Sequence, residues 1–354
     1  MKTLKTYAFD WPGLALLIAA ILATSSFGIW FAGYRLINKF PIRVEGGSIL
    51  SYDPVLGFVA LPNSATKRFD RPDHPENGGY DLYADRLSAR VSAAGEQTPD
   101  KVDVLFIGDS VTYGAGVQNA QTYANIVPRL LGAVGVNLAF PSYGTTLSLL
   151  MLRRNLNLRP RLVVYSILTD HLRRNVLPCA DFYYTFCMDQ AYVTTGPKIH
   201  PPWTNGVRRL KTQIMYETRG LDPFTWFVHG IDVVIGRVLF GYSLQYSVQY
   251  ALHKTEDTKA REIGLDYLLG EMATAAKSIN AKLIVVFIPI LGETSTPAAI
   301  TKVVQGRRGI DFLDLTKLFQ QQGRAVTEMY IPNDGHLSVM GHALVADAIA
   351  DHVR

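Results

Sequence analysis

Short apolar runs alternate with amphipathic stretches from Val102 to the end of the chain. Apolar runs of about four to eight residues between Gly, Asp or Asn are typical of strands buried on both faces. They fall at Val102–Ile107, Val134–Leu138, Leu162–Ile167, Lys282–Ile288 and Ile310–Leu313. Helical spacing follows at Gln121–Leu131, Leu147–Leu156, Ala260–Ile279, Thr316–Gln322 and Val339–His352. This alternation predicts an α/β fold with a parallel sheet of about five strands.

The N-terminal part has a different pattern, because no charged residue occurs from Trp11 to Tyr34. A helix of that length covers roughly 36 Å, more than the ~30 Å hydrocarbon core of a bilayer. We therefore expect a transmembrane anchor at residues 11–34. Basic residues flank it on both sides and do not settle its orientation, so the cytoplasmic N-terminus at residues 1–10 is expected from the cysteines discussed below. The alternative is a cleaved signal peptide, with Ala23-Thr24-Ser25 as a poor cleavage site. The run exceeds the usual h-region of about 7–15 residues, which favours the anchor.

Two further boundaries follow from composition. Residues 35–100 are expected to be a connecting lead-in that packs on a domain at residues 101–354. That domain carries an insertion at about residues 181–255, between the third and fourth strands. Within it, residues 224–242 are apolar apart from a polar stripe at helical spacing, formed by Thr225, His229, Asp232 and Gly236. The stripe predicts a helix buried against the domain or, alternatively, a lid or membrane-lying surface.

Charge argues against a nucleic-acid role. The 354 residues carry a net charge of +5, and 48% of them are hydrophobic, ample for a core. Basic residues occur as short pairs without interleaved aromatic residues, which we interpret as solvated edges; the pairs are Arg153-Arg154, Arg173-Arg174, Arg208-Arg209 and Arg307-Arg308. Nucleic-acid binding requires longer basic patches, so none is expected.

The chemistry of the chain is concentrated in two short segments. Gly108-Asp109-Ser110 follows the first strand and precedes a helical pattern, so Ser110 is expected near a helix N-terminus, where free N–H groups favour negative charge. Asp334 and His336 lie two apart on a late loop, and such residues point the same way in extended backbone. The Asp can then orient the ring while its other nitrogen faces the serine. The alternatives are a common turn tripeptide and a solvated turn or helix cap beside Ser338.

Other polar residues have structural interpretations. Asp109 is explained as a cap of the helix that carries Ser110, and Asp170 as a hydrogen-bond partner. Asn175 either bridges to Asp170 or ends a helix, and His342 is expected to pack on the last helix. Asp103 and Asp311 lie near strand starts, away from the C-terminal strand edge where ligands bind, and carry no case for catalysis.

These segments together resemble a known family. Gly108-Asp109-Ser110, Asn137 with its loop, Thr169-Asp170 and Asp334-Gly335-His336 are similar to the sequence blocks of the GDSL, or SGNH, hydrolases. The segments Gly114–Val117 and Asp170–Asn175 resemble membrane-anchored bacterial members. The resemblance implies a flavodoxin-like three-layer α/β/α fold and ester hydrolysis or acyl transfer. It assigns the nucleophile to Ser110, the general base to His336 and its orientation to Asp334. Asp109, Asp170 and His171 are further candidates for supporting roles.

The resemblance departs from the family at the oxyanion hole. The family takes donors from the serine N–H, a glycine and an asparagine, and this chain has Ser142 and Thr169 at the last two positions. Ser142 lacks the conformational freedom of glycine, and Thr169 offers one hydroxyl in place of an amide NH₂. Losing one donor can cost about 2.7–4 kcal/mol in the transition state. Thr169 therefore donates through its hydroxyl, His171 replaces it, or turnover is slow.

The two cysteines bear on the compartment. Cys179 and Cys187 lie in one polar-aromatic loop, which favours a short disulfide in an oxidising space over two buried free thiols. The disulfide predicts that the domain lies outside the inner membrane. Their spacing from His residues does not fit a metal site, so no metal or other cofactor is expected.

Together these features predict a serine-dependent esterase or O-acyltransferase of the bacterial inner membrane, with its domain in the periplasm or outside. Its substrate is expected to be an acyl ester of the cell envelope, carried by a polysaccharide or, as a second choice, a lipid. The alternative is a non-catalytic glycan-binding subunit of an envelope polysaccharide assembly, which the threonine at position 169 favours. Protein partners are not predicted.

Overall fold

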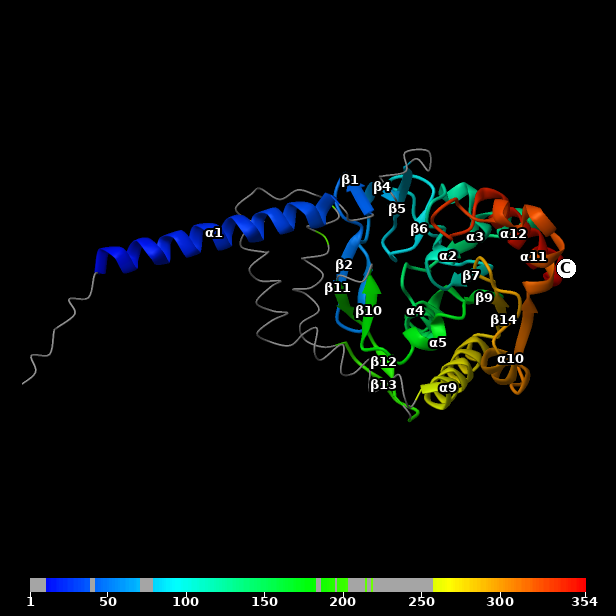
Figure 1. Ribbon diagram of the computed structural model, residues 1–354. Coiled ribbons are helices and arrows are strands. Elements are labelled where there is room, and N and C mark those ends of the chain that lie inside the picture. Colours follow the sequence, from blue (N-terminus) through cyan, green and yellow to red (C-terminus); the bar gives the residue numbers. More distant parts are fainter. Residues whose placement is uncertain are drawn as a thin grey trace, which may run out of the picture. The chain divides into compact units, whose positions relative to one another are not determined.

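The computed structural model describes residues 11–38, 42–70, 79–182, 186–194, 196–202, 214, 218 and 257–354 (Figure 1). The chain divides into two compact units, residues 1–40 with 219–249 and residues 41–218 with 250–354. The apolar segment 224–242 and the pair Arg208-Arg209 lie outside the described residues. The second unit holds Ser110, Asp334 and His336, so its fold is given in more detail.

Five parallel strands form the centre of the second unit, and they are the strands that the sequence predicts. They are β7 (Val104–Ile107), β8 (Gly135–Asn137), β9 (Leu162–Ile167), β14 (Lys282–Phe287) and β15 (Ile310–Asp314). Their order across the sheet is β8-β7-β9-β14-β15. This is the flavodoxin-like order, in which the crevice for ligands opens between the first and third strands. Here those strands are β7 and β9.

The strands are buried on both faces, which explains their nearly continuous apolar sequence. Side chains of one face, including Val104, Val164 and Val286, share a cluster with the helices α3 (Tyr123–Leu131) and α12 (Val339–Val353). Their alternate neighbours, such as Leu105 and Val285, are equally buried on the other face. The helices on that side of the sheet are drawn together in Figure 1; they are α4 (Thr145–Arg154), α9 (Asp257–Ser278) and α10 (Ala298–Gln305). The predicted α/β class with a mostly parallel central sheet is confirmed.

The lead-in at residues 35–100 is more than a connection. Its strands extend the same sheet to nine strands, in the order β1-β4-β5-β6 before β8. They are β1 (Ile42–Glu45), β4 (Ala65–Asp70), β5 (Tyr80–Ala84) and β6 (Arg90–Val91), and β2 (Leu50–Asp53) with β3 (Gly57–Ala60) forms a separate hairpin. The junction is antiparallel and pairs Arg90 with Asn137. The sequence analysis missed these strands because they are short and their polar residues break the apolar runs.

The remaining elements are short. They are α2 (Ser110–Tyr113), η2 (Asn119–Gln121), η3 (Leu156–Leu158), α5 (His171–Arg174), β10 (Cys179–Phe182), β11 (Phe186–Asp189), β12 (Tyr192–Val193), β13 (Ile199–His200), α11 (Thr316–Gln321) and η4 (Gly323–Met329). The helices predicted from the spacing after residue 101 are present except the one at residues 224–242, which lies outside the described residues, and α10 was not predicted. Its buried residues Ile300, Val303 and Val304 follow helical spacing, but the pattern covers barely two turns.

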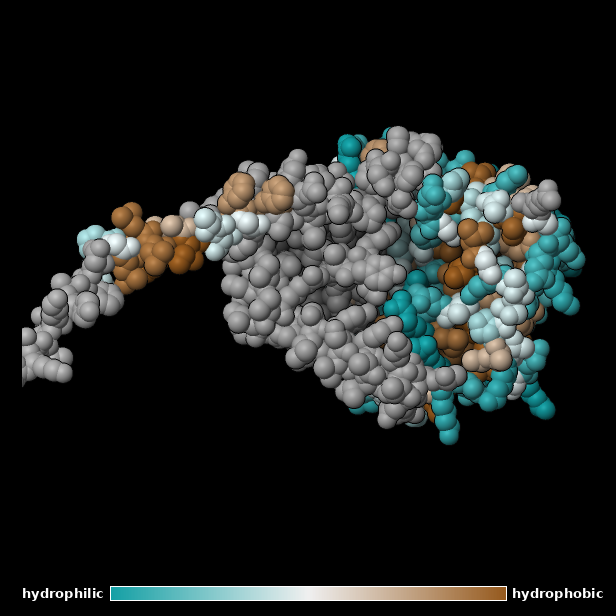
Figure 2. All heavy atoms as spheres, in the orientation of Figure 1, coloured by the Kyte–Doolittle hydropathy of each residue, from teal (hydrophilic) through white to brown (hydrophobic). Residues whose placement is uncertain are grey.

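The first unit contributes α1 (Trp11–Asn38), so the predicted helix at residues 11–34 is present. Large apolar side chains are exposed along it, including Leu16, Ile21 and Phe27, and Figure 2 shows this stretch as predominantly hydrophobic. Searched over the described residues alone, no helix is long and apolar enough to cross a membrane. The transmembrane expectation is therefore not confirmed.

Candidate active site

Ser110 is the first residue of α2, directly after β7. Asp109 caps this short helix, since its Oδ1 accepts the Val111 N–H at 3.0 Å. Gly108 allows the sharp turn before it, because a Cβ there would lie 2.1 Å from the Thr112 hydroxyl and 2.5 Å from that of Ser166. The strand end and the cap therefore place Ser110 at the C-terminal edge of the sheet, as the sequence predicts.

The late loop brings its two residues to Ser110. The Nε2 of His336 lies 2.9 Å from the Ser110 Oγ, although the two residues are 226 positions apart. The Nδ1 of His336 contacts the Oδ1 of Asp334 in a hydrogen bond. Burial alone would raise the pKa of Asp334, but the hydrogen bond and charge of His336 outweigh it and lower that pKa. The Asp334 carboxylate is therefore ionised at neutral pH and can orient the ring.

The loop shape that makes this contact depends on positive φ angles. Asn333 has φ of 62° and Gly335 has φ of 87°, on either side of Asp334. The His336 carbonyl accepts the Ile331 N–H at 2.7 Å, which closes the loop on itself. The loop thus presents Asp334 and His336 on the side that faces α2.

The predicted oxyanion donors follow three different strands. Ser110 follows β7, Ser142 lies in the loop after β8, and Thr169 follows β9. Ser142 has φ of 67°, in the left-handed region that favours glycine. Among the described residues, no acceptor is found for the N–H of Ser110 or Ser142. The buried Thr169 hydroxyl likewise has no hydrogen-bond partner there, so it is available as a donor.

A second Asp–His pair lies beneath the nucleophile. The Asp109 Oδ2 is 3.3 Å from the Nε2 of His171, and both side chains are 0% exposed. The Nδ1 of His171 contacts the Tyr165 hydroxyl at 2.8 Å. Burial would raise the pKa of Asp109, but the contact with His171 and the charge of Arg174 lower it. Because both ring nitrogens of His171 face buried groups, it is not placed to replace Thr169 as a donor.

Arg174 completes this buried network and is not a solvated residue. Its side chain is only 20% exposed, and its NH1 donates to Asp109 Oδ2 at 3.1 Å. Its Nε donates to Asp170 Oδ2 at 2.8 Å, and Arg173 also binds Asp170. The Asp170 side chain is 35% exposed, and these two guanidinium groups lower its pKa to about 2. The solvated-edge interpretation of this pair was wrong for Arg174; the Asp170–Arg174 spacing of i,i+4 was the signal that could have found the network.

Arg90 is a second residue that the sequence analysis missed. From β6 it inserts into the turn after α2, where its NH1 donates to the Gly114 carbonyl at 2.6 Å and to that of Tyr113. Its NH2 donates to the Val117 carbonyl, and its guanidinium lies 4.9 Å from the centre of the Tyr113 ring. The extension at residues 42–91 therefore supports the segment that carries Ser110. No local sequence signal connects Arg90 to that turn.

The remaining candidates have structural roles. His342 is buried, its Nδ1 accepts the Tyr123 N–H at 3.2 Å, and burial lowers its pKa to about 3. Asn175 does not bridge to Asp170 in any contact found, and instead binds Thr145 and Thr146 at the start of α4. Asp103 pairs with Arg161, and Asp311 pairs with Lys282 and His352. A search of the described residues finds no group of three or more metal-ligand side chains.

The side chains of Cys179 and Cys187 lie outside the described residues. Their backbone belongs to the β10–β11 hairpin, where Cys179 pairs with Asp189 and Cys187 with Asp181. The cysteines are therefore diagonal rather than directly opposite in the hairpin. The disulfide remains a prediction.

Comparison with known proteins gives structural neighbours but no sequence match. No protein-family model matches the chain, and no curated protein matches it. A GDSL-like lipase from Bacteroides thetaiotaomicron is 13% identical with a TM-score of 0.34, covering 71% of this chain and 87% of that one. A carbohydrate esterase family 2 enzyme of Corynascus thermopiles is 14% identical with a TM-score of 0.37, covering 88% and 85%. The salicylyl-acyltransferase SsfX3 of a tetracycline biosynthetic pathway is 12% identical with a TM-score of 0.37, covering 88% and 77%. The solved structures that this chain is similar to thus include GDSL-like lipases, esterases and acyltransferases.

Proposed function

We propose that the protein is a serine-dependent ester hydrolase or O-acyltransferase. The observation that carries the proposal is the continuous contact from Ser110 Oγ through His336 to Asp334, beside N–H groups free to bind an oxyanion. All five residues of the proposed site are partly exposed, whereas Asp109 and His171 are fully buried; the five are Ser110, Ser142, Thr169, Asp334 and His336. Ser110 and His336 are therefore accessible from solvent, while the Thr169 hydroxyl itself lies buried in the proposed site.

The geometry supports a two-step reaction. The Ser110 Oγ forms a bond to the acyl carbon of the ester while His336 Nε2 takes the hydroxyl proton, and Asp334 stabilises the resulting imidazolium. The carbonyl oxygen becomes an oxyanion bound by the Ser110 and Ser142 N–H groups and by the Thr169 hydroxyl. As the tetrahedral intermediate collapses, the C–O bond to the alcohol breaks and His336 returns the proton to it. Water or an acceptor hydroxyl then attacks the acyl-serine, with His336 again as base, and regenerates Ser110.

The finer assignment is an O-acyl ester of a cell-envelope polysaccharide, with lipid esters as the second substrate class. Support comes from the resemblance of the motifs to anchored bacterial SGNH proteins and from the partly exposed site, which suits a bulky polymer. Hydrolysis and transfer differ only in whether water or a sugar hydroxyl attacks the acyl-serine. Incubation with an activated acetyl ester and an acetyl-free envelope glycan, followed by mass spectrometry of the glycan, distinguishes them. Glycan that gains acetyl groups indicates transfer, and free acetate alone indicates hydrolysis.

The site itself is tested with a fluorophosphonate probe on the full-length protein in detergent. Wild type is expected to be labelled and Ser110→Ala not, since the probe reacts with an activated serine. A serine-matched control is Ser338→Ala, because the Ser338 hydroxyl binds the Glu328 carbonyl and the Gly341 N–H and has no part in the proposed reaction. Absence of labelling in folded wild type would contradict the catalytic function and favour the glycan-binding subunit.

We also propose that α1 anchors the protein in a bacterial inner membrane with the second unit in the periplasm. The support is the uncharged sequence from Trp11 to Tyr34 and the exposed apolar side chains along α1. Sedimentation with membranes that persists in alkaline carbonate, together with protease access in spheroplasts, tests both parts. Release by carbonate would contradict the anchor, and protection in spheroplasts would contradict the periplasmic side.

A further inference from the structure

The three proposed oxyanion donors depend on three separate segments for their positions. They follow β7, β8 and β9, which are neighbours in the sheet, but all three donors lie beyond the last residues of those strands. Between the β7 and β8 segments, backbone hydrogen bonds continue as far as the Phe140 N–H and the Gly108 carbonyl, at 3.3 Å, two residues before Ser142 and Ser110. The donors themselves lie beyond this last backbone contact. A donor must lie about 2.7–3.1 Å from the developing oxyanion to stabilise it, so something must hold these segments in register.

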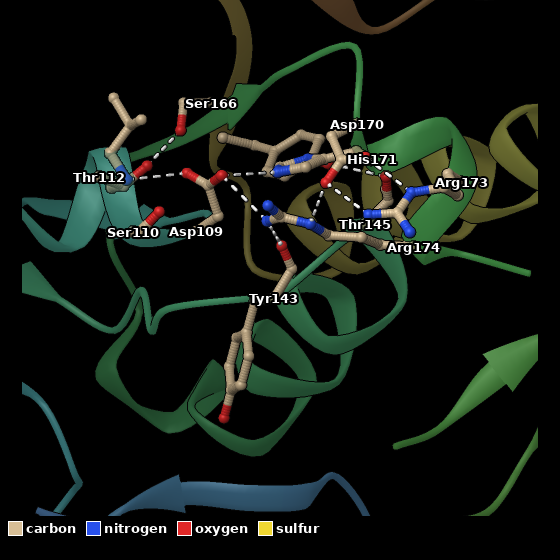
Figure 3. Close-up of polar contacts among 12 residues, drawn as sticks. Asp109, Ser110, Thr112, Tyr143, Thr145, Ser166, Asp170, His171, Arg173 and Arg174 are labelled. Atoms are coloured by element: carbon tan, nitrogen blue, oxygen red, sulfur yellow. Dashed lines mark hydrogen bonds and ion pairs between the residues drawn. The ribbon is translucent and has the colours of Figure 1, made fainter. Parts of the chain in front are cut away.

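Arg174 contacts a residue adjacent to each of the three donors (Figure 3). Its NH1 donates at 3.1 Å to Asp109, which precedes Ser110, and at 3.1 Å to the carbonyl of Tyr143, which follows Ser142. Its Nε donates at 2.8 Å to Asp170, which follows Thr169. One guanidinium group thus joins the segments after β7, β8 and β9.

Close packing around Arg174 restricts the position of α5 relative to the loop of Ser142. A Cβ at Gly144 would lie 3.0 Å from the Arg174 Cβ and 2.8 Å from the Asn175 Oδ1, so α5 is packed directly against the loop of Ser142. Asn175 also accepts the Thr146 N–H at 3.3 Å and donates to Thr145 at 2.9 Å. The Asp109 carboxylate is fully buried, so its partners are held in place by the cost of leaving it unpaired.

Arginine is suited to this position and lysine is not. The guanidinium has five N–H donors in a fixed planar fork, so NH1 can serve Asp109 and Tyr143 while Nε serves Asp170. A lysine ammonium is a single point on a flexible stem, so it can bind one carboxylate but not bridge all three segments in fixed geometry.

Resting on the proposed function, we propose that Arg174 is a positioning residue that holds the three oxyanion-donor segments in register. It does not touch the substrate in this proposal, and it acts on the reaction through the Ser110, Ser142 and Thr169 donors. Weakening the Arg174 contacts with Asp109, Tyr143 and Asp170 would displace the oxyanion donors without removing them. A displacement of about 1 Å can cost on the order of 100-fold in rate.

The test is Arg174→Lys in the full-length protein, beside a matched Arg154→Lys control. Arg154 also forms an ion pair with a carboxylate, Asp53, but lies on α4 and has no part in the proposed site. With an activated acyl ester, Arg174→Lys is expected to lower kcat roughly 10- to 100-fold with KM within about 3-fold, because transition-state contacts are lost. Arg154→Lys is expected to keep the wild-type kcat. An unchanged kcat in folded Arg174→Lys would overturn the proposal.

A second measurement does not depend on turnover. Amide hydrogen exchange is expected to rise in Arg174→Lys in peptides covering residues 108–114, 140–146 and 168–175, and to stay at the wild-type level there in Arg154→Lys. Exchange that rises only around residues 168–175 would show that Arg174 supports its own helix and would overturn the proposal. If wild type lacks turnover, the proposed enzyme function fails, and exchange in the three segments still decides the role of Arg174.

Arg174→Ala with added methylguanidine separates positioning from general stability. Restored kcat in the presence of methylguanidine, without a matching effect on Arg154→Ala, is the expected result because the added cation can reoccupy the space between Asp109, Tyr143 and Asp170. Equal thermal stability with and without the additive would show that rescue acts on the site. If Arg174→Ala does not fold, Arg174→Lys remains the deciding variant.

Discussion

Two Asp–His pairs flank Ser110, and they have opposite environments. His336 is 23% exposed and its Asp334 partner 8%, whereas His171 and Asp109 are completely buried. The ring nitrogen of His336 that does not face Asp334 lies 2.9 Å from the Ser110 hydroxyl. The corresponding nitrogen of His171 contacts the Tyr165 hydroxyl at 2.8 Å instead. An Asp–His pair can act as a general base only if the histidine nitrogen that does not face the Asp contacts the nucleophile. The pair must also be accessible to the substrate, and only His336 with Asp334 meets both conditions.

Sequence distance is misleading in this comparison. Asp109 is adjacent to Ser110, but its carboxylate points to the cap of α2, His171 and Arg174. Asp334 is far along the chain, yet its histidine reaches the serine. Both carboxylates have a lowered pKa, so the direction of the pKa shift does not distinguish them, and only geometry does.

Replacing His336 and replacing His171, each by glutamine, is expected to give the largest difference in kcat between the two Asp–His pairs. His336→Gln removes the proposed general base and should lower kcat on the order of 10⁴-fold or more. His171→Gln should lower kcat far less, by about 10-fold, because it acts only through the packing of Asp109. Steady-state kinetics with an activated ester, at matched folded fractions by circular dichroism, measures both. Equal losses would remove the distinction between the pairs.

Replacing Asp334 and replacing Asp109 should affect different properties, the first kcat and the second the free energy of unfolding. Asp334→Asn should mainly lower kcat, on the order of 10⁴-fold, since the amide cannot hold the required tautomer of His336. Asp109→Asn should mainly lower the free energy of unfolding, on the order of 3 kcal/mol, because it leaves the largely buried Arg174 guanidinium without its carboxylate partner. Urea unfolding and steady-state kinetics on both variants separate these effects. A large kcat loss in Asp109→Asn with only a stability loss in Asp334→Asn would assign the catalytic role to Asp109 instead.

Thr169→Val tests whether the hydroxyl, and not His171, completes the oxyanion hole. Valine keeps the shape but removes the donor, so kcat should fall about 100-fold with little change in KM. Thr169→Asn should keep or raise activity, since the amide NH₂ can donate to the oxyanion in place of the hydroxyl. A Thr169→Val variant with wild-type kcat would show that two N–H donors suffice.

The smallest effect concerns acid stability of the buried network. The pKa of Asp170 is lowered from 3.8 to about 2, so its contribution to stability is present above pH 3.8 and is lost as the pH falls toward 2. The difference in Tm between wild type and Asp170→Asn should therefore be largest above pH 4 and shrink between pH 4 and 2. Thermal melts across that range measure it. A difference that is independent of pH would show that the Asp170 charge is not the stabilising feature.

Much of the fold was predictable because its signals are local. A strand buried on both faces must be apolar at every position, so the five parallel strands could be located from Val102–Ile107 onward. The Gly-Asp-Ser turn and the Asp334–His336 spacing also indicated chemistry without a structure. The strand β6, between β5 and β8, was missed because it has only two residues and its buried Arg90 is satisfied by carbonyls of the distant turn after α2.

The sequence by itself indicated the candidate nucleophile after a strand and the Asp–His pair on a late loop, and the resemblance of its motifs indicated the candidate donors. Only the tertiary structure decided that Ser142 adopts left-handed backbone, that Arg90 binds the turn after α2, and that Arg174 joins three loops. The physical reason is that these contacts connect segments distant in sequence, and a side chain's partner there depends on the folded sheet rather than on local spacing. Arg173 and Arg174 are adjacent and chemically identical, and only the packing of α5 directs Arg174 to Asp109 and the Tyr143 carbonyl.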